Sequence, residues 1–144
     1  IQDSLVGSEM CIRDSNRCVY GVFDPVGYGA DGKYGNEWDM TIWISDRGIE
    51  SGRLKDILIH EAAHAYSYLV LRGCVVPDGS SFRELAHKRY GDEEHLADVF
   101  VLYYGGKWTN YDGRENIPIR DRSWMSNMID YCNLYEEALA TLSS

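Results

Sequence analysis

The residues best suited to chemistry lie in the segment His60-Glu61-Ala62-Ala63-His64. Residues four positions apart share one face of a helix, so both imidazoles can bind a single metal ion. Glu61 is turned by about 100° from His60, so its carboxylate reaches a water on the metal rather than the metal itself. Zinc lowers the pKa of such a water to about 7, and the carboxylate takes its proton during attack on a carbonyl. The spacing therefore predicts a zinc site with a general base.

A catalytic zinc needs a third protein ligand. One known arrangement continues the same helix with a glycine and then a histidine, but Ser67 and Val70 occupy those positions and exclude it. The other arrangement takes a carboxylate from a later helix. The candidates are Glu84, Glu93, Glu94 and Asp98.

The segment 94–98 reads Glu-His-Leu-Ala-Asp. It resembles the E-x-x-A-D motif of gluzincin-type zinc metallopeptidases, in which this motif and HExxH lie on neighbouring helices. The resemblance covers about residues 39–106 and implies a minimal zincin-like fold. It also implies that Glu94 is the third ligand and that Asp98 accepts the outer N–H of a metal-bound histidine. Glu93 and Asp98 stay open as alternative third ligands.

The chain opens with two β-rich segments, over residues 18–23 and 38–45. A glycine-rich loop over residues 27–35 separates them, and it lacks the pattern of a phosphate-binding loop. The second segment is either a plain core strand or a sheet edge on which an extended peptide could lie. Strands followed by helices predict an α+β fold.

Three longer helices and one short helix must follow the strands. Ser51 or Gly52 can begin a helix that runs to about Arg72. A short helix is expected over 82–89, one over 93–104 capped by Asp92, and a final one from Ser123. The expected core stripe of the first helix is Leu54, Ile57, Leu58, Ala62, Ala65 and Leu69. That of the last helix is Met128, Tyr131, Tyr135, Leu139 and Leu142, with Met125 also in the core.

Composition excludes several classes of protein. The 144 residues hold 14 Lys+Arg against 23 Asp+Glu, a net charge of -9. An acidic chain without a basic cluster is a poor candidate for binding nucleic acid or an anionic membrane. No apolar run approaches the ~20 residues that span a bilayer. This net negative charge weakly favours neutral or basic substrates, because long-range electrostatic attraction guides positively charged molecules to the protein.

Residues 5–15, LVGSEMCIRDS, match a translated transposase-type sequencing adapter. We therefore expect residues 1–15 to be non-native, and 16–144 to be one domain that lacks its native start. This part has 129 residues, a net charge of -7 and the cysteines Cys18, Cys74 and Cys132. Either one disulfide with a free thiol or three buried thiols would fit. The compartment stays open, with secretion slightly favoured.

Other polar residues carry weaker signals. We expect His87 and His95 to face solvent, because the ligand set is filled without them. A tyrosine or histidine donor is expected to stabilise the transition state. The sequence does not choose among Tyr90, Tyr104, Tyr111 and Tyr131.

Three functions are compatible with these residues. The first is a zinc-dependent metallopeptidase acting on peptides or proteins, with zinc as cofactor. The second is a repressor-cleaving metallopeptidase of a mobile element, although no helix-turn-helix is evident here. The third is a non-catalytic zinc module that binds a partner through a strand edge. The intact Glu61 argues against the third, because a structural site needs no base.

Overall fold

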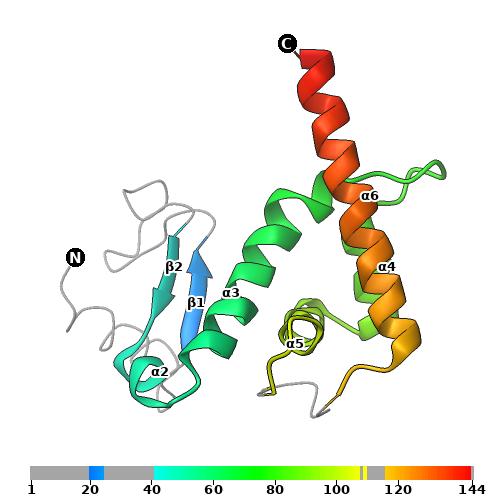
Figure 1. Cartoon of the computed structure of the whole chain (residues 1–144). Helices are drawn as coiled ribbons and strands as arrows, with labels where there is room; N and C mark the ends of the chain where they lie inside the picture. The colour runs from blue at the N-terminus through cyan, green and yellow to red at the C-terminus, as the bar shows by residue number, and fades with distance from the viewer. Residues whose placement is uncertain (1–19, 25–40, 108, 110–115, 144) are drawn as a thin grey trace. The chain divides into compact units, whose positions relative to one another are not determined.

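A computed structural model describes residues 20–24, 41–107, 109 and 116–143. The architecture is α+β, as predicted: a two-stranded antiparallel sheet precedes the helices (Figure 1). The chain forms two compact units, and the boundary falls inside one helix, after Ala65. None of the described helices is both long and apolar enough to cross a membrane.

The first unit holds the sheet. β1 (Gly21–Asp24) pairs with β2 (Thr41–Ile44), and Gly21 lies opposite Ile44 in the register. Within the described residues, β1 begins after Tyr20 and β2 ends before Ser45, whereas residues 18–19, 27–35 and 38–40 of the sequence prediction lie outside the described part of the chain. β2 is paired on one side only among the described residues, so its role as a peptide-binding edge stays a prediction.

A short helix, α2 (Asp46–Glu50), follows β2 at a place where no helix was predicted from the sequence. Ser45 is its N-cap, and the Ser45 Oγ accepts a hydrogen bond from the backbone N–H of Gly48 at 3.1 Å. Gly48 is required because a Cβ there would lie 2.4 Å from the carbonyl oxygen of Tyr20. The packing of α2 on the chain before β1 therefore determines the residue type.

The predicted first helix is α3 (Leu54–Leu69), and a 3-10 turn, η1 (Leu71–Gly73), follows it. The predicted core stripe is largely wrong. Ile57 is buried, but Leu54, Leu58 and Leu69 are 38%, 42% and 53% exposed. The buried face carries polar residues instead, because the helix buries its candidate site. These polar residues are His60, Glu61 and Ser67.

The second unit contains three helices besides the last turn of α3. These helices are α4 (Phe82–Tyr90), α5 (Glu93–Tyr103) and α6 (Ile119–Ser143). The first two agree with the prediction, and Asp92 caps α5 through a 2.8 Å bond from the N–H of His95. α6 begins four residues before the predicted Ser123.

α5 contributes more residues to the second unit's core than any other element, since all its residues from Leu96 to Leu102 are buried. Met125 and Met128 of α6 are buried as predicted. The later members of the predicted α6 stripe are not: Leu139 and Leu142 are 43% and 83% exposed. A disulfide joins Cys74, just after η1, to Cys132 of α6.

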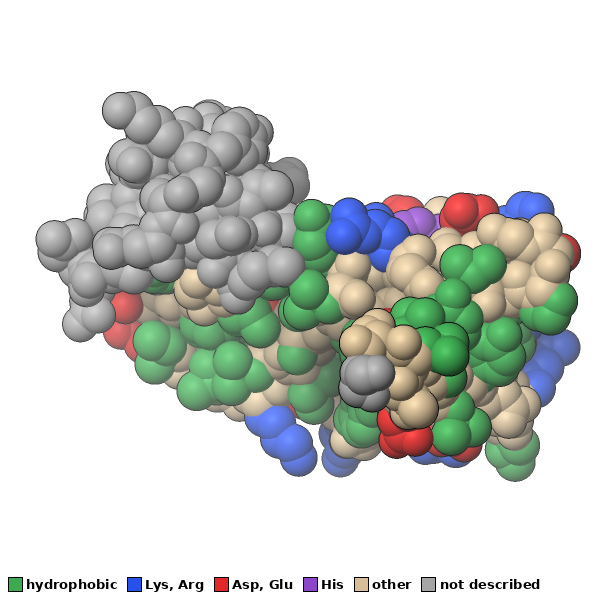
Figure 2. All heavy atoms as spheres, turned by 90° about the horizontal axis from the view of Figure 1, so that it is seen from above, with side chains coloured by type: hydrophobic (Ala, Val, Ile, Leu, Met, Phe, Trp, Pro, Cys, Tyr) green, Lys and Arg blue, Asp and Glu red, His purple; other side chains and the backbone are tan. Residues whose placement is uncertain are grey.

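Figure 2 shows one face of the chain. Acidic and basic side chains are interspersed on the described part of this face, with hydrophobic side chains among them. No broad basic patch is seen there, in keeping with the acidic composition.

Candidate metal centre

The two histidines of the HExxH segment meet on α3. Their Nε2 atoms are 3.2 Å apart, and the rings are nearly perpendicular, at 83°. Two nitrogens bound at ~2.0–2.1 Å to a tetrahedral zinc would be separated by about 3.3 Å. His60 is 6% exposed, and His64 is partly buried. The pair therefore has the spacing of two nitrogen ligands of one ion.

Glu61 places a carboxylate beside this pair. Its Oε1 lies 3.9 Å from the Nε2 of His60, and the residue is only 5% exposed. β1 comes very close to it: a Cβ at Gly21 would lie 3.1 Å from the Cγ of Glu61. The glycine leaves space for the Glu61 side chain against the strand. The arrangement thus puts a proton acceptor next to the two nitrogen donors.

Glu93, the main rival for the third ligand, is engaged elsewhere. Its Oε1 accepts a hydrogen bond from the Oγ of Ser67 at 2.8 Å and is 2.6 Å from the Nε2 of His87. The Nε of Arg83 also donates to it, at 3.4 Å. This carboxylate therefore ties the end of α3 to α4 and α5. The sequence analysis did not predict a role for Ser67, which it noted only because this residue occupies the glycine position of the excluded motif; Ser67 lies about one turn after His64.

His60, His64 and Glu94 are the residues that the structure groups as able to hold a metal ion, within the described part of the chain. One donor atom of each lies within 4.8 Å of the others. Two imidazoles and one carboxylate are the donor set of several catalytic zinc sites, which keep a fourth position for water or substrate. The donor chemistry fits a zinc ion, and Glu93 is absent from the group.

Asp98 lies one turn after Glu94 on α5 and is 0% exposed. A carboxylate buried so deeply must be hydrogen-bonded or paired to offset its lost hydration. Its neighbour Ala97 is also buried. The burial is compatible with a role in orienting a ligand, and that role stays a prediction.

The other two histidines differ from each other. His87 was expected to face solvent rather than to bind the metal; its side chain is 31% exposed, contacts Glu93, and is not in the group of possible metal ligands. His95 is more exposed, and its Nδ1 lies 2.8 Å from the Oδ1 of Asp92. The two histidines therefore differ in their carboxylate partner, Glu93 for His87 and Asp92 for His95.

The candidate tyrosine donors for the transition state have different surroundings. The Tyr131 hydroxyl donates to the carbonyl oxygen of Val75 at 3.2 Å, while Tyr111 lies outside the described residues. Burial, and then the charge of Tyr103, raises the pKa of Tyr104. Burial, followed by nearby negative charges, raises the pKa of Tyr66 to about 12. Tyr66 and Tyr104 therefore keep their hydroxyl protons at neutral pH.

No family model, curated protein or solved structure matches this chain. The case for an activity therefore depends on the residues of the site themselves.

Proposed function

We propose that this chain is a zinc-dependent peptidase in which His60, His64 and Glu94 hold the ion and Glu61 is the general base. The observation that carries the proposal is the grouping of the three donor side chains within 4.8 Å. The carboxylate of Glu61, 3.9 Å from the Nε2 of His60, adds the proton acceptor that hydrolysis needs. The resemblance of residues 94–98 to the gluzincin motif supports the same assignment.

When bound, the zinc supplies a Lewis acid for the peptide carbonyl and for the attacking water. Glu61 takes the proton from that water and then donates it to the nitrogen of the leaving amine. Its burial keeps the carboxylate in a poorly hydrated site, where its interactions with the reacting groups are stronger. Asp98 acts as a positioning residue, accepting the outer N–H of a ligand histidine and so fixing its tautomer.

The test compares Glu61→Gln with Glu84→Gln. Glu84 is an exposed glutamate in the first turn of α4 and serves as the matched control. Elemental analysis should find about one zinc per chain in both variants, as expected for a site with three protein ligands. Hydrolysis of a casein-type substrate should fall at least ~100-fold in Glu61→Gln and be unchanged in Glu84→Gln.

Two results would contradict the proposal. Full hydrolysis by Glu61→Gln would remove the general base from the mechanism. A wild-type chain that binds zinc and cleaves no peptide would instead be a non-catalytic zinc module.

A further inference from the structure

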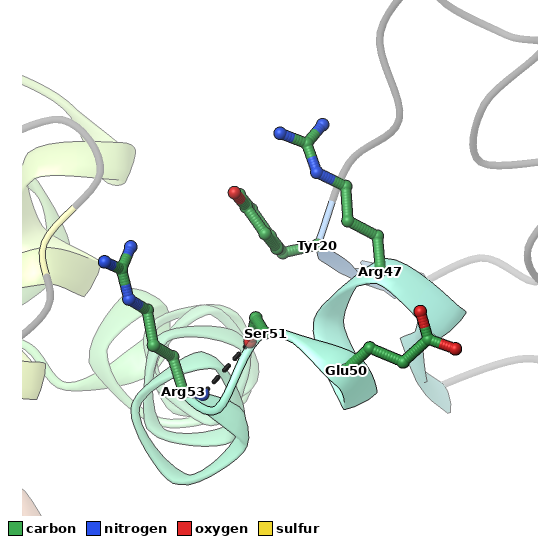
Figure 3. A pocket seen from close by; sticks show the side chains of 5 residues that line it. All are labelled: Tyr20, Arg47, Glu50, Ser51 and Arg53. Carbon is green, nitrogen blue, oxygen red and sulfur yellow. Dashed lines mark hydrogen bonds between the residues drawn. The ribbon is translucent and has the colours of Figure 1, made fainter.

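A pocket of about 520 Å³ lies in the first unit, beside the residues that lead into α3. Tyr20, Arg47, Glu50, Ser51 and Arg53 line it (Figure 3). The Tyr20 hydroxyl and the two guanidinium groups point to one side of the view, whereas the Glu50 carboxylate points away from them. The lining of the pocket therefore combines the Tyr20 hydroxyl and two guanidinium groups with one carboxylate.

The fold fixes the part of this pocket that Tyr20 and Arg47 form. The carbonyl oxygen of Tyr20 accepts hydrogen bonds from the N–H and the Oγ of Ser45, at 3.0 and 3.1 Å. The Arg47 guanidinium lies over the Tyr20 ring, 4.6 Å from its centroid. An arginine stacked on an aromatic ring loses less freedom when it binds an anion.

The turn between α2 and α3 fixes the other part. The Oγ of Ser51 donates to the carbonyl oxygen of Gly48 at 2.7 Å and accepts from the backbone N–H of Arg53 at 3.0 Å. The backbone of Arg53 is thereby held where α3 begins. A guanidinium presents a planar fork of donors that matches the two oxygens of a carboxylate.

This pocket is a short distance from the candidate base. Tyr20 directly precedes Gly21, whose Cβ position lies 3.1 Å from the Cγ of Glu61. Arg53 is seven positions before His60, which corresponds to two helical turns or ~10 Å on nearly the same face. An extended peptide covers ~3.3 Å per residue, so about three residues span that distance.

We propose that this pocket binds a carboxylate of the peptide substrate, about three residues from the bond that is cleaved. The inference deepens the peptidase proposal and rests on it. The carboxylate is that of an acidic side chain or of the substrate's C-terminus, which offer the same chemistry to the two arginines. The pocket would make this chain selective for peptides with negative charge at one position, in spite of its own acidic composition.

Binding can be measured separately from hydrolysis in the Glu61→Gln chain. The first probes are neutral ten-residue peptides with a dansyl label and an amidated C-terminus. Each carries either Glu or Gln at one position, and this position differs from one pair of peptides to the next. A second pair is neutral throughout and ends in a free carboxylate or an amide. Fluorescence anisotropy should show about tenfold tighter binding of the carboxylate peptide at one position, or in the C-terminal pair.

The same measurement in chains that also carry Arg47→Gln or Arg53→Gln should reduce that preference to less than about threefold. Lys55→Gln is the matched control: Lys55 is an exposed cation two positions after Arg53 and outside the pocket, and its removal should preserve the preference. The inference is overturned if no carboxylate position is preferred, or if both arginine variants keep the full preference.

Cleavage by the wild-type chain separates this inference from the one on which it rests. Cleavage without any carboxylate preference would support the peptidase and overturn the pocket assignment. Arginine-dependent carboxylate binding without cleavage of any peptide would support the pocket and overturn the peptidase.

Discussion

Two adjacent glutamates on α5 have different surroundings, and this difference can be tested. Glu94 belongs to the group of potential metal ligands, whereas Glu93 is bonded to Ser67, His87 and Arg83. Glu94→Gln should weaken zinc binding by more than about 100-fold, because a neutral amide replaces a charged ligand. Glu93→Gln should leave zinc affinity nearly unchanged and lower the free energy of unfolding by about 1–2 kcal/mol.

Competition with a chromophoric chelator measures the first effect, and urea unfolding measures the second. If Glu93→Gln lost zinc while Glu94→Gln kept it, the assignment of the third ligand would be reversed.

Asp92 gives a prediction about pH. The backbone N–H of His95, and then its side chain, lower the pKa of the Asp92 carboxyl below its ordinary value. Because the folded-state pKa is lowered, this stabilisation is complete above the ordinary value near 4 and is lost as the pH falls through the lower one. Between pH 5 and pH 3 the wild-type melting temperature should therefore fall further than that of Asp92→Asn, which caps the helix without titrating. Equal falls would show that the cap does not contribute to the pH dependence.

At the scale of the element, α2 depends on a glycine for packing rather than for flexibility. A Cβ at Gly48 would lie 2.4 Å from the backbone oxygen of Tyr20, which cannot move independently. Gly48→Ala should lower the free energy of unfolding by about 1–3 kcal/mol, although alanine is the better helix former. Gly73→Ala is the control, since a Cβ there meets no atom within 4 Å, and its effect should stay within about 0.5 kcal/mol. Urea unfolding measures both, and a stabilising Gly48→Ala would contradict the contact.

The elements also show what the sequence could and could not predict. The HExxH spacing on a helix and the Asp92 cap depend on neighbours within one turn, and both lie where the spacing predicts. α2 was missed because five residues beginning Asp-Arg-Gly carry little helical signal, and its position depends on Tyr20, twenty-five residues before its cap. The predicted core stripe of α3 was wrong because it was chosen by the spacing of apolar residues such as Leu58. The structure instead turns the face with the polar residues His60 and Glu61 inward and leaves Leu58 exposed.

At the scale of the whole molecule, the disulfide between Cys74 and Cys132 makes the largest covalent constraint among the described residues. The sequence left a disulfide and free thiols open, because the pairing depends on how η1 and α6 meet. The two cysteines are separated by 58 positions, so the bond restricts a long loop of the unfolded chain. On chain-entropy grounds its loss should lower the free energy of unfolding by about 2–4 kcal/mol.

Urea unfolding with and without a reductant measures this effect. The control is the double variant Cys74→Ser, Cys132→Ser, which lacks this bond, so that a reductant cannot lower its stability by breaking it. An equal stability of the oxidised and reduced wild-type chains would contradict a stabilising role.

The same bond encloses Glu94 and Asp98 in a covalent ring, while His60 and His64 lie on the chain before the ring begins. One cut by a foreign protease anywhere between the two cysteines would break the chain without releasing either piece. A nicked molecule would migrate as one band on a non-reducing gel and as two bands after reduction. Under oxidising conditions, a cut in this part of the chain would therefore not change the apparent size of the molecule. α5, which carries Glu94, would stay covalently linked to the segment that carries His60 and His64.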